Sequence, residues 1–424
     1  MAGRSYLRRA TTFRRAASTK VVVGAVVGIL IVAAIAGYVL LLAPGSTNST
    51  TPSGAPYKIG IIEDTTSSLA GWSHETLAIA QIAVDQINSQ GGVLGRPVQL
   101  ITASEGTNAL AAAQSLVLQN NVSAVVGVSY SGDAISMMPF LSSHHVLGIF
   151  TSDSLDNLMQ NVTSDYTNFK YFFRVFATNT NLATDLQSFF QNGSKPASVY
   201  YISENFQSGQ AMYAGLNATC QKLGIKVLGG SLVPFSQTDF SAIAAQIASL
   251  HPSAVIDGQI GSGATTFISQ LKANPGAAGI KIYYISQGAL ADPAVLSSIM
   301  SSSPGSLEGL IIADYPGTYF KPYNSEGATL AAAYKNATGT AFYTDPAGSY
   351  LGIKALVQAI QKANSFDPNV IIPQLEQIHY DSPLGLLTFD SAHNWKVPGF
   401  WYVQIQGGNQ TIVWPPQYAT GKVQ

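Results

Sequence analysis

The alternation of short apolar runs with helical patterns restricts the fold of this chain more than any other feature of its sequence. Residues 57–62 predict a strand, and the apolar spacing over 75–90 predicts the helix that follows it. Further strands are predicted at 98–103, 123–128 and 146–150, and a second series after Arg174 has strands at 198–202, 226–228, 254–257 and 281–285. Such alternation gives parallel sheets covered by helices, so the sequence predicts an α/β protein of two doubly wound parallel-sheet lobes.

The N-terminal part of the chain contains an uncharged apolar run of 23 residues at 21–43. At about 1.5 Å per residue, a helix of this length spans roughly 35 Å, enough for a hydrocarbon core of about 30 Å. Six basic residues precede the run, and the first acidic residue is Glu63. Because basic flanks stay inside the cell, we expect a cytoplasmic tail at 1–20, a single transmembrane anchor at 21–43 and an extracellular body beyond it. A cleaved signal peptide is the alternative, although its apolar region usually covers only about 7–15 residues.

The segment that follows the apolar run has the composition of a tether. Residues 44–56 contain only Pro, Gly, Ser, Thr, Asn and Ala, which predicts a flexible linker. Asn-x-Ser/Thr sequons occur at Asn48, Asn121, Asn161, Asn192, Asn217, Asn336 and Asn409. With the predicted topology, these sequons indicate an extracellular glycoprotein.

The charge balance of the body argues against several classes of protein. Beyond residue 20 the chain carries 15 basic and 22 acidic side chains, and only 10% of all residues are charged. Average soluble proteins have roughly 25% charged residues. A sparse, weakly acidic surface excludes nucleic acid as a partner, and the single Cys220 excludes an internal disulfide framework. Low charge also suggests the hypothesis that the body is exposed to an acidic medium.

A search for catalytic motifs finds none. The Gly-Val-Ser-Tyr-Ser segment at 127–131 lacks the final glycine of a nucleophile elbow. The six histidines show no metal-binding spacing, and the glycines at 258–263 do not have the spacing of a dinucleotide-binding loop. The sequence therefore predicts no catalytic residue, no metal, no cofactor and no enzyme activity.

Polar and aromatic residues recur where the predicted strands end. They are Trp72, Ser131, Ser152, Asp153 and Ser154 in the first series, and Phe206, Asp257 and residues 286–288, which include Gln287, in the second. Ligands of open α/β sheets bind beyond the carboxyl ends of the strands. Hydroxyls and helix N-termini suit a small anion such as a carboxylate. Each residue alone is equally consistent with a cap or a turn, but their recurrence favours a binding site.

Several segments resemble a known family. They are IGII at 59–62, AVDQINSQGGVLGRPVQL at 83–100, SAVVGVSYSGDA at 123–134, VLGIFTSDSLDNL at 146–158, FFRVFATNTN at 172–181, FSQTDFSAIAAQI at 235–247 and SPLGLLTFDSAHN at 382–394. The chain from Tyr57 almost to its end is similar to the type I periplasmic-type solute-binding proteins of ABC transporters, in the branched-chain amino acid (Leu/Ile/Val) branch.

The resemblance implies two lobes joined by three crossovers, which close on a ligand by hinge motion. Lobe 1 is expected at 57–175 plus 312–380, and lobe 2 at 176–311 plus 381–424. The implied partners are a small-molecule ligand and ABC permease subunits, and the implied ligands are amino acids, amides, urea or aromatic acids. A receptor sensor domain is the alternative, although a 20-residue cytoplasmic tail is too short to signal alone.

The resemblance also implies roles for individual residues. Ser131 and Ser154 match the hydroxyl residues that hold the ligand carboxylate, and Ser152 matches a position that offers its carbonyl to the ammonium group. Trp72 and Phe206 match aromatic residues that pack on the ligand from the two lobes.

One departure from the family concerns the ammonium group of the ligand. Amino acid binders carry a glutamate at the position of 286–288, where this chain has no acid. Asp153 or Asp257 is a candidate replacement, and an amide, a urea-like compound or a non-amino carboxylate is the alternative ligand. Tyr315 and Tyr350 are further candidates near the second crossover.

Overall fold

The computed structural model describes residues 52–424, apart from residues 68, 107, 287 and 319. The predicted tail at 1–20, the predicted anchor at 21–43, most of the linker at 44–56, Asn48 and Gln287 lie outside the described residues. Within the described part of the chain, no helix has both the length and the apolar character needed to cross a membrane.

The first lobe is built on a five-stranded sheet. Its strands are β1 (Tyr57–Glu63), β2 (Val98–Ser104), β3 (Ala124–Gly127), β4 (Leu147–Phe150) and β5 (Phe172–Arg174), in the order β2-β1-β3-β4-β5. All neighbouring strands are parallel. β3 and β4 are buried along their whole length, as expected for central strands covered on both faces. This confirms the predicted parallel sheet.

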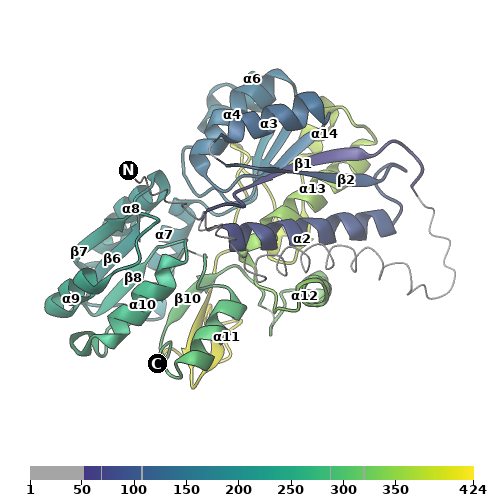
Figure 1. Ribbon diagram of the computed structural model, residues 1–424. Helices are drawn as coiled ribbons and strands as arrows, with labels where there is room; N and C mark the ends of the chain where they lie inside the picture. The colour runs from purple at the N-terminus through teal and green to yellow at the C-terminus, as the bar shows by residue number, and fades with distance from the viewer. Residues whose placement is uncertain (1–51, 68, 107, 287, 319) are drawn as a thin grey trace, which may run out of the picture. The chain divides into compact units, whose positions relative to one another are not determined.

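Helices cover both faces of this sheet. They are α2 (Ala70–Ser89), α3 (Ala109–Gln114) continued by a π-helical turn (Ser115–Gln119), α4 (Ser131–Ser143), α5 (Gln160–Ser164), α6 (Tyr166–Phe169), α12 (Ser325–Thr338), α13 (Gly348–Ala363) and α14 (Pro368–Glu376). α3 and α4 lie on one face, and α2 and α13 lie on the other (Figure 1). Gly91 and Gly92 follow the last turn of α2 with φ values of 98° and 73°, the left-handed conformation that ends many helices.

The second lobe contains a seven-stranded sheet with the order β14-β13-β10-β9-β8-β6-β7. Its parallel strands are β6 (Ser198–Glu204), β7 (Lys226–Val233), β8 (Ala254–Asp257), β9 (Lys281–Tyr284) and β10 (Ile311–Asp314). β13 (Trp401–Gln406) and β14 (Asn409–Trp414) form an antiparallel hairpin on one edge. The alternation of strands and helices did not predict this hairpin, because its strands are joined by a Gly-Gly turn without an intervening helix.

The helices of the second lobe are α7 (Asn179–Asn192), α8 (Gln207–Leu223), α9 (Ser241–Leu250), α10 (Gly263–Ala273) and α11 (Pro293–Ser302), with a short 3₁₀ turn at Pro275–Ala277. Successive side chains of β6 point to opposite faces. Val199 and Tyr201 pack into the core that includes α7 and α8, whereas Tyr200 and Ile202 pack into the core of α9 and α10. The sheet is therefore buried between two helical layers.

The described chain passes between the lobes three times: after β5, after β10, and between the small hairpin β11 (Tyr380–Ser382)–β12 (Gly385–Leu387) and β13. Tyr315 connects these passages. Its hydroxyl accepts a hydrogen bond from the backbone N–H of Ala177 at 2.8 Å, and its ring stacks on Trp395 with the centroids 5.3 Å apart. The N–H of Trp395 donates to the carbonyl of Arg174 at 2.9 Å. The crossovers thus form one bonded bundle beside the sheets.

The pairing of β10 differs from the expected boundary of lobe 1. The range 312–380, expected in lobe 1, includes the last residues of β10, and these pair with β9 and β13 in the second sheet.

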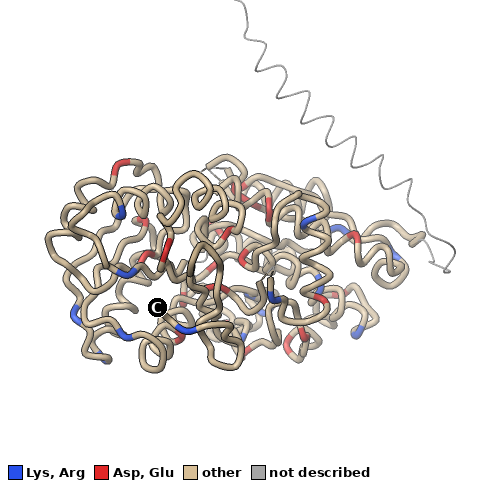
Figure 2. Tube along the Cα trace, turned by 90° about the horizontal axis from the view of Figure 1, so that it is seen from below, with Lys and Arg blue, Asp and Glu red and all other residues tan. Residues whose placement is uncertain are grey.

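Charged residues are scattered along the described trace and form no extended basic stretch within it (Figure 2).

Candidate ligand-binding site

A pocket lies where the carboxyl ends of both sheets meet. Its lining comes from the loops after β3 and β4 of the first lobe, from the start of α8, and from the loops after β8 and β9 of the second lobe. The space measures about 760 Å³, including the part open to solvent.

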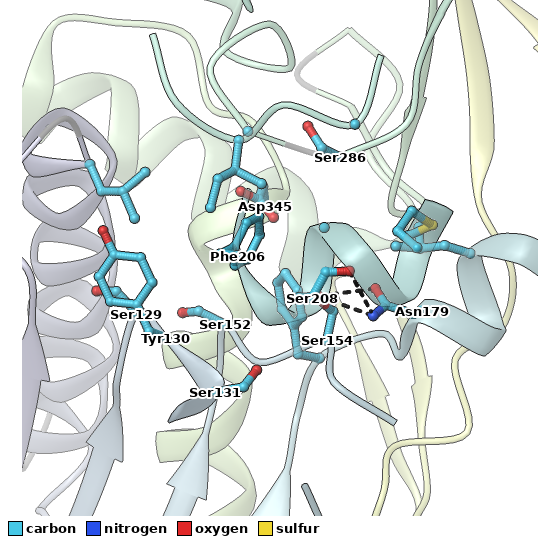
Figure 3. Close-up of a pocket in the computed structure, with 18 of the residues that line it drawn as sticks. Ser129, Tyr130, Ser131, Ser152, Ser154, Asn179, Phe206, Ser208, Ser286 and Asp345 are labelled. Carbon is cyan, nitrogen blue, oxygen red and sulfur yellow. Dashed lines mark hydrogen bonds between the residues drawn. The ribbon is translucent and has the colours of Figure 1, made fainter. Parts of the chain in front are cut away.

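Five of the predicted ligand-binding residues line this pocket: Trp72, Ser131, Ser152, Ser154 and Phe206. Figure 3 shows Ser131, Ser152 and Ser154 in the lower part of the view and Ser286, the neighbour of Gln287, in the upper part. The structure therefore brings strand-end residues of both lobes, far apart in the sequence, into one pocket.

Four other candidates do not line the pocket. Asp153 is fully buried between its two serine neighbours. Asp257 ends β8 inside the sheet, and its carboxylate accepts the backbone N–H of Gln259 at 2.9 Å. Tyr315 is buried in the crossover bundle, and the weaker candidate Tyr350 donates its hydroxyl to Gln86 inside lobe 1. Burial or a hydrogen bond within the protein fixes each of these side chains outside the ligand space.

Two helices point their N-termini at the pocket. Ser131 is the first residue of α4, and Ser208 and Gly209 lie in the first turn of α8. Backbone N–H groups in a first turn have no partner within the helix, and the helix dipole adds partial positive charge. Among the described residues, no Lys, Arg or His lines the pocket. An anion bound there is thus held by hydroxyls and backbone N–H groups.

Hydroxyl and amide groups connect the lobes across the pocket. Ser154 Oγ of the first lobe lies 2.5 Å from Ser208 Oγ of the second. The side-chain amide of Asn179 donates to Ser208 Oγ at 3.1 Å (Figure 3). The sequence did not single out Ser208 and Asn179, because Ser208 lies inside a helix and Asn179 begins one. The position of Ser208 could have indicated it, since Ser208 lies only two residues after the predicted site residue Phe206.

Aromatic rings cover part of the pocket. The ring of Tyr130, from the first lobe, meets Phe235 of the second lobe edge to face at a centroid distance of 6.1 Å. Phe235 also contacts Phe206 at 5.4 Å. These three rings make a continuous apolar contact from one lobe to the other.

Asp345 also lines the pocket, and sequence reasoning missed it. It begins a 3₁₀ turn (Asp345–Ala347) just before α13, so it follows no strand. Trp72 donates its indole N–H to Asp345 Oδ2 at 2.6 Å, whereas Asp345 Oδ1 is buried without a partner in the described structure. Burial and the nearby charge of Asp314 raise the pKa of Asp345 well above its usual value, although the bond from Trp72 opposes this.

A group of buried acids lies behind Ser129 in the first lobe. The N–H of Ser129 donates to Glu105 at 3.1 Å, and its hydroxyl donates to Glu63 at 3.2 Å. Burial raises the pKa of Glu105 to about 8, and burial with the charge of Glu105 raises the pKa of Glu63 well above normal. Burial also raises the pKa of Asp153 to about 8, although the charge of Arg174 opposes it. The raised pKa values favour the protonated form of these carboxyls.

The buried acids do not form a metal site: in the part of the chain that the structure describes, no group of three His, Cys, Asp or Glu side chains is arranged to hold an ion.

Comparisons with known proteins agree with this architecture. A family model described as periplasmic binding protein matches residues 56–410. The Leu/Ile/Val-binding protein homolog 7 of Brucella suis biovar 1 (strain 1330) is 22% identical over 390 residues, covering 88% of this chain and 94% of that protein.

Solved structures share the fold. A solute binding protein of an ABC transporter from R. palustris, in complex with benzoate, has a TM-score of 0.71 at 17% identity, covering 85% of this chain and 96% of that chain. A branched-chain amino acid transporter substrate binding protein from Streptococcus pneumoniae, in complex with isoleucine, also has a TM-score of 0.71 at 17% identity, covering 84% and 97%.

The family match covers most of the chain and confirms the resemblance found in the sequence. It also confirms the prediction that the chain is not an enzyme, because the family consists of binding proteins. The chain belongs to the periplasmic binding protein family.

Proposed function

We propose that this protein is the solute-binding component of an ABC transporter and captures a small amino acid-like ligand between its lobes. The observation that carries the proposal is the pocket at the carboxyl ends of both sheets, lined by serines and helix N-termini from the two lobes. The likeness to proteins bound to isoleucine and benzoate supports a ligand of this size that carries a carboxylate.

In this proposal the ligand carboxylate binds to Ser131 and Ser154 and to the N-terminus of α4, while Ser152 offers a further polar contact. Ser152 Oγ is buried and without a partner in the described structure, so a ligand group that bonds to it recovers a hydrogen bond. Trp72 and Phe206 pack on the apolar part of the ligand from the two lobes.

Closure of the lobes by hinge motion is part of the proposal. The bond between Ser154 and Ser208 and the contact between Tyr130 and Phe235 join the lobes directly across the pocket. The bonded bundle around Tyr315 lies where the chain crosses between lobes, which is where a hinge has to bend. Ligand entry requires the direct contacts to break while the crossovers persist.

We further propose the arrangement of the whole chain. The tail at 1–20 is cytoplasmic, residues 21–43 anchor the protein in the cell membrane, and 44–56 tether an extracellular, glycosylated body beside its ABC permease. Lobe 1 comprises 57–175 plus 315–380, and lobe 2 comprises 176–314 plus 381–424, because β10 pairs within the second sheet. Measuring the mass of the mature protein from the membrane fraction tests the anchor and the sequons together.

A thermal shift panel tests the proposed function. The full chain is melted with amino acids, amides, urea and aromatic acids, and a true ligand at 100 times its dissociation constant stabilises the protein by about 2.7 kcal/mol. In the Ser131→Ala variant we expect roughly fivefold weaker binding, because one hydrogen bond to the carboxylate is lost. A panel in which no compound shifts the melting curve contradicts the proposed function.

A further inference from the structure

We propose that Asp345 is the counter-charge for a protonated amine on the ligand, so that the pocket takes a small zwitterion in preference to a simple carboxylic acid. This inference rests on the proposed function and specifies its ligand class. It assigns to the turn before α13 the acidic role that the 286–288 segment of this chain lacks.

The geometry of Asp345 carries the inference. The residue is 3% exposed yet lines the pocket, and one of its two carboxyl oxygens has no partner in the described structure. A buried carboxyl oxygen that makes no hydrogen bond is costly, so the site is incomplete without a donor from the ligand. The other oxygen is fixed by the indole N–H of Trp72 at 2.6 Å, which holds the carboxyl group in one orientation.

The rest of the lining makes a cation the fitting donor. No described residue that lines the pocket is Lys, Arg or His, so nothing in the protein neutralises an ionised Asp345 from within the pocket. A simple carboxylate ligand would add a second acid to this space and bring no cation to an ionised Asp345. A zwitterion places its carboxylate on the serines and helix N-termini and its ammonium on Asp345, which satisfies both sides.

The candidates suggested by the sequence do not compete for this role. Asp153 and Asp257 are fully buried and do not line the pocket. Of the buried acids near the site, Asp345 alone among the described residues lines the pocket itself. Asp314, whose carboxylate accepts the N–H of Tyr315 and the hydroxyl of Thr344, lies behind it.

Ligand binding is expected to change the protonation of Asp345. Burial and the nearby charge of Asp314 raise the pKa of Asp345 well above its usual value, which favours the protonated carboxyl in the empty pocket. An ammonium group favours the ionised carboxylate, so binding of the zwitterion releases a proton into solution. Binding of a carboxylic acid without an amine leaves Asp345 protonated and releases none at this residue.

The test uses matched probes that differ only in the amine. Calorimetric titration of the full chain at pH 7 compares leucine with 4-methylpentanoate and phenylalanine with 3-phenylpropanoate, in two buffers of different ionisation enthalpy. We expect one amine-bearing probe to bind at least tenfold more tightly than its partner and to release about one proton. Tighter binding of the partner without the amine, or binding of the amine without proton release, overturns the inference and leaves the proposed function intact.

Asp345→Asn isolates the charge, because asparagine has nearly the same shape. We expect this variant to lose at least tenfold in affinity for the amine-bearing probe and to bind the amine-free probe within about threefold of the wild type. Asp185→Asn is the matched control, since Asp185 is a mostly buried carboxyl on α7 with one unpartnered oxygen and does not line the pocket. Equal losses for both probes in Asp345→Asn, or failure of all four probes with the wild type, contradict the inference. A thermal shift panel in which no compound shifts the melting curve contradicts the proposed function.

Discussion

The first strand of each lobe ends in a buried glutamate, and the two glutamates are used differently. Glu204, at the end of β6, accepts the backbone N–H groups of Ile260 and Gly261, both at 2.9 Å, and so holds the loop that lines the pocket. Glu63, at the end of β1, accepts only the hydroxyl of Ser129, and its second oxygen has no partner in the described structure.

The difference follows from the neighbours of each acid. Glu204 meets two backbone donors, which oppose the rise in its pKa that burial causes. Glu63 meets a second acid, Glu105, whose charge raises the pKa of Glu63 further. Equivalent places in two similar lobes therefore carry different chemistry: a loop anchor in the second lobe and a pair of acids with raised pKa values in the first.

The largest expected effect is the difference in unfolding free energy between two single variants, Glu204→Gln and Glu63→Gln. Glu204→Gln replaces one acceptor oxygen by a donor, so one backbone N–H of the 260–261 loop loses its bond, and the free energy of unfolding falls by about 1–3 kcal/mol. Glu63→Gln imitates the protonated carboxyl that the raised pKa of Glu63 favours, so we expect it to cost less than about 1 kcal/mol. Urea denaturation of both variants at pH 7 measures the difference. Equal losses would show that the two glutamates are used alike.

The next effect is the pH dependence of stability. Burial raises the pKa of Glu105 and of Asp153 to about 8, against about 4 in an unfolded chain. Because the folded state holds protons that the unfolded state releases, this stabilisation is complete below about pH 4 and is lost as the pH rises through about 8. We expect the melting temperature to fall by several degrees between pH 5 and pH 9, and to fall less in Glu105→Gln.

This pH profile bears on the hypothesis of an acidic medium. A body with few surface charges and many neutral buried acids keeps its stability when carboxyls are protonated. A melting temperature that rises from pH 5 to pH 9, or that drops steeply toward pH 3, would contradict both the pKa shifts and the hypothesis.

The smallest expected effect concerns the contact between the lobes. Ser208→Ala removes the hydroxyl that meets Ser154 and Asn179, so we expect ligand affinity to fall roughly fivefold by loss of about one net hydrogen bond. Ser194→Ala is the matched control, because Ser194 bonds Tyr283 in the second lobe away from the pocket. An unchanged affinity for the panel ligand in Ser208→Ala would remove this contact from the closure mechanism.

Sequence reasoning reached most of the fold because strand and helix periods are local properties. The capping of α3 by Asn108, whose side chain accepts the N–H of Ala111 at 2.9 Å, and the left-handed Gly-Gly end of α2 each depend only on a short segment. The antiparallel hairpin β13–β14 was not predicted, since its place in the second sheet depends on pairing with the distant β10.

The site residues also divide into those that a local pattern indicates and those that depend on distant parts of the chain. Ser131, Ser152 and Ser154 follow strands, so the rule for open sheets located them. Asp345 reaches the pocket from the turn before α13, 273 residues after its partner Trp72, and no local pattern indicates that approach. Asp153 was predicted because it follows the fourth strand of the first lobe, but burial separates it from the ligand space.

The most direct test of the account is calorimetric titration of the best ligand from the thermal shift panel into the wild type, Trp72→Ala and Ser131→Ala. The account predicts one ligand per wild-type chain, with affinity reduced roughly fivefold or more in each variant while both variants remain folded. Unchanged affinity in both variants would place the binding site elsewhere and contradict the account.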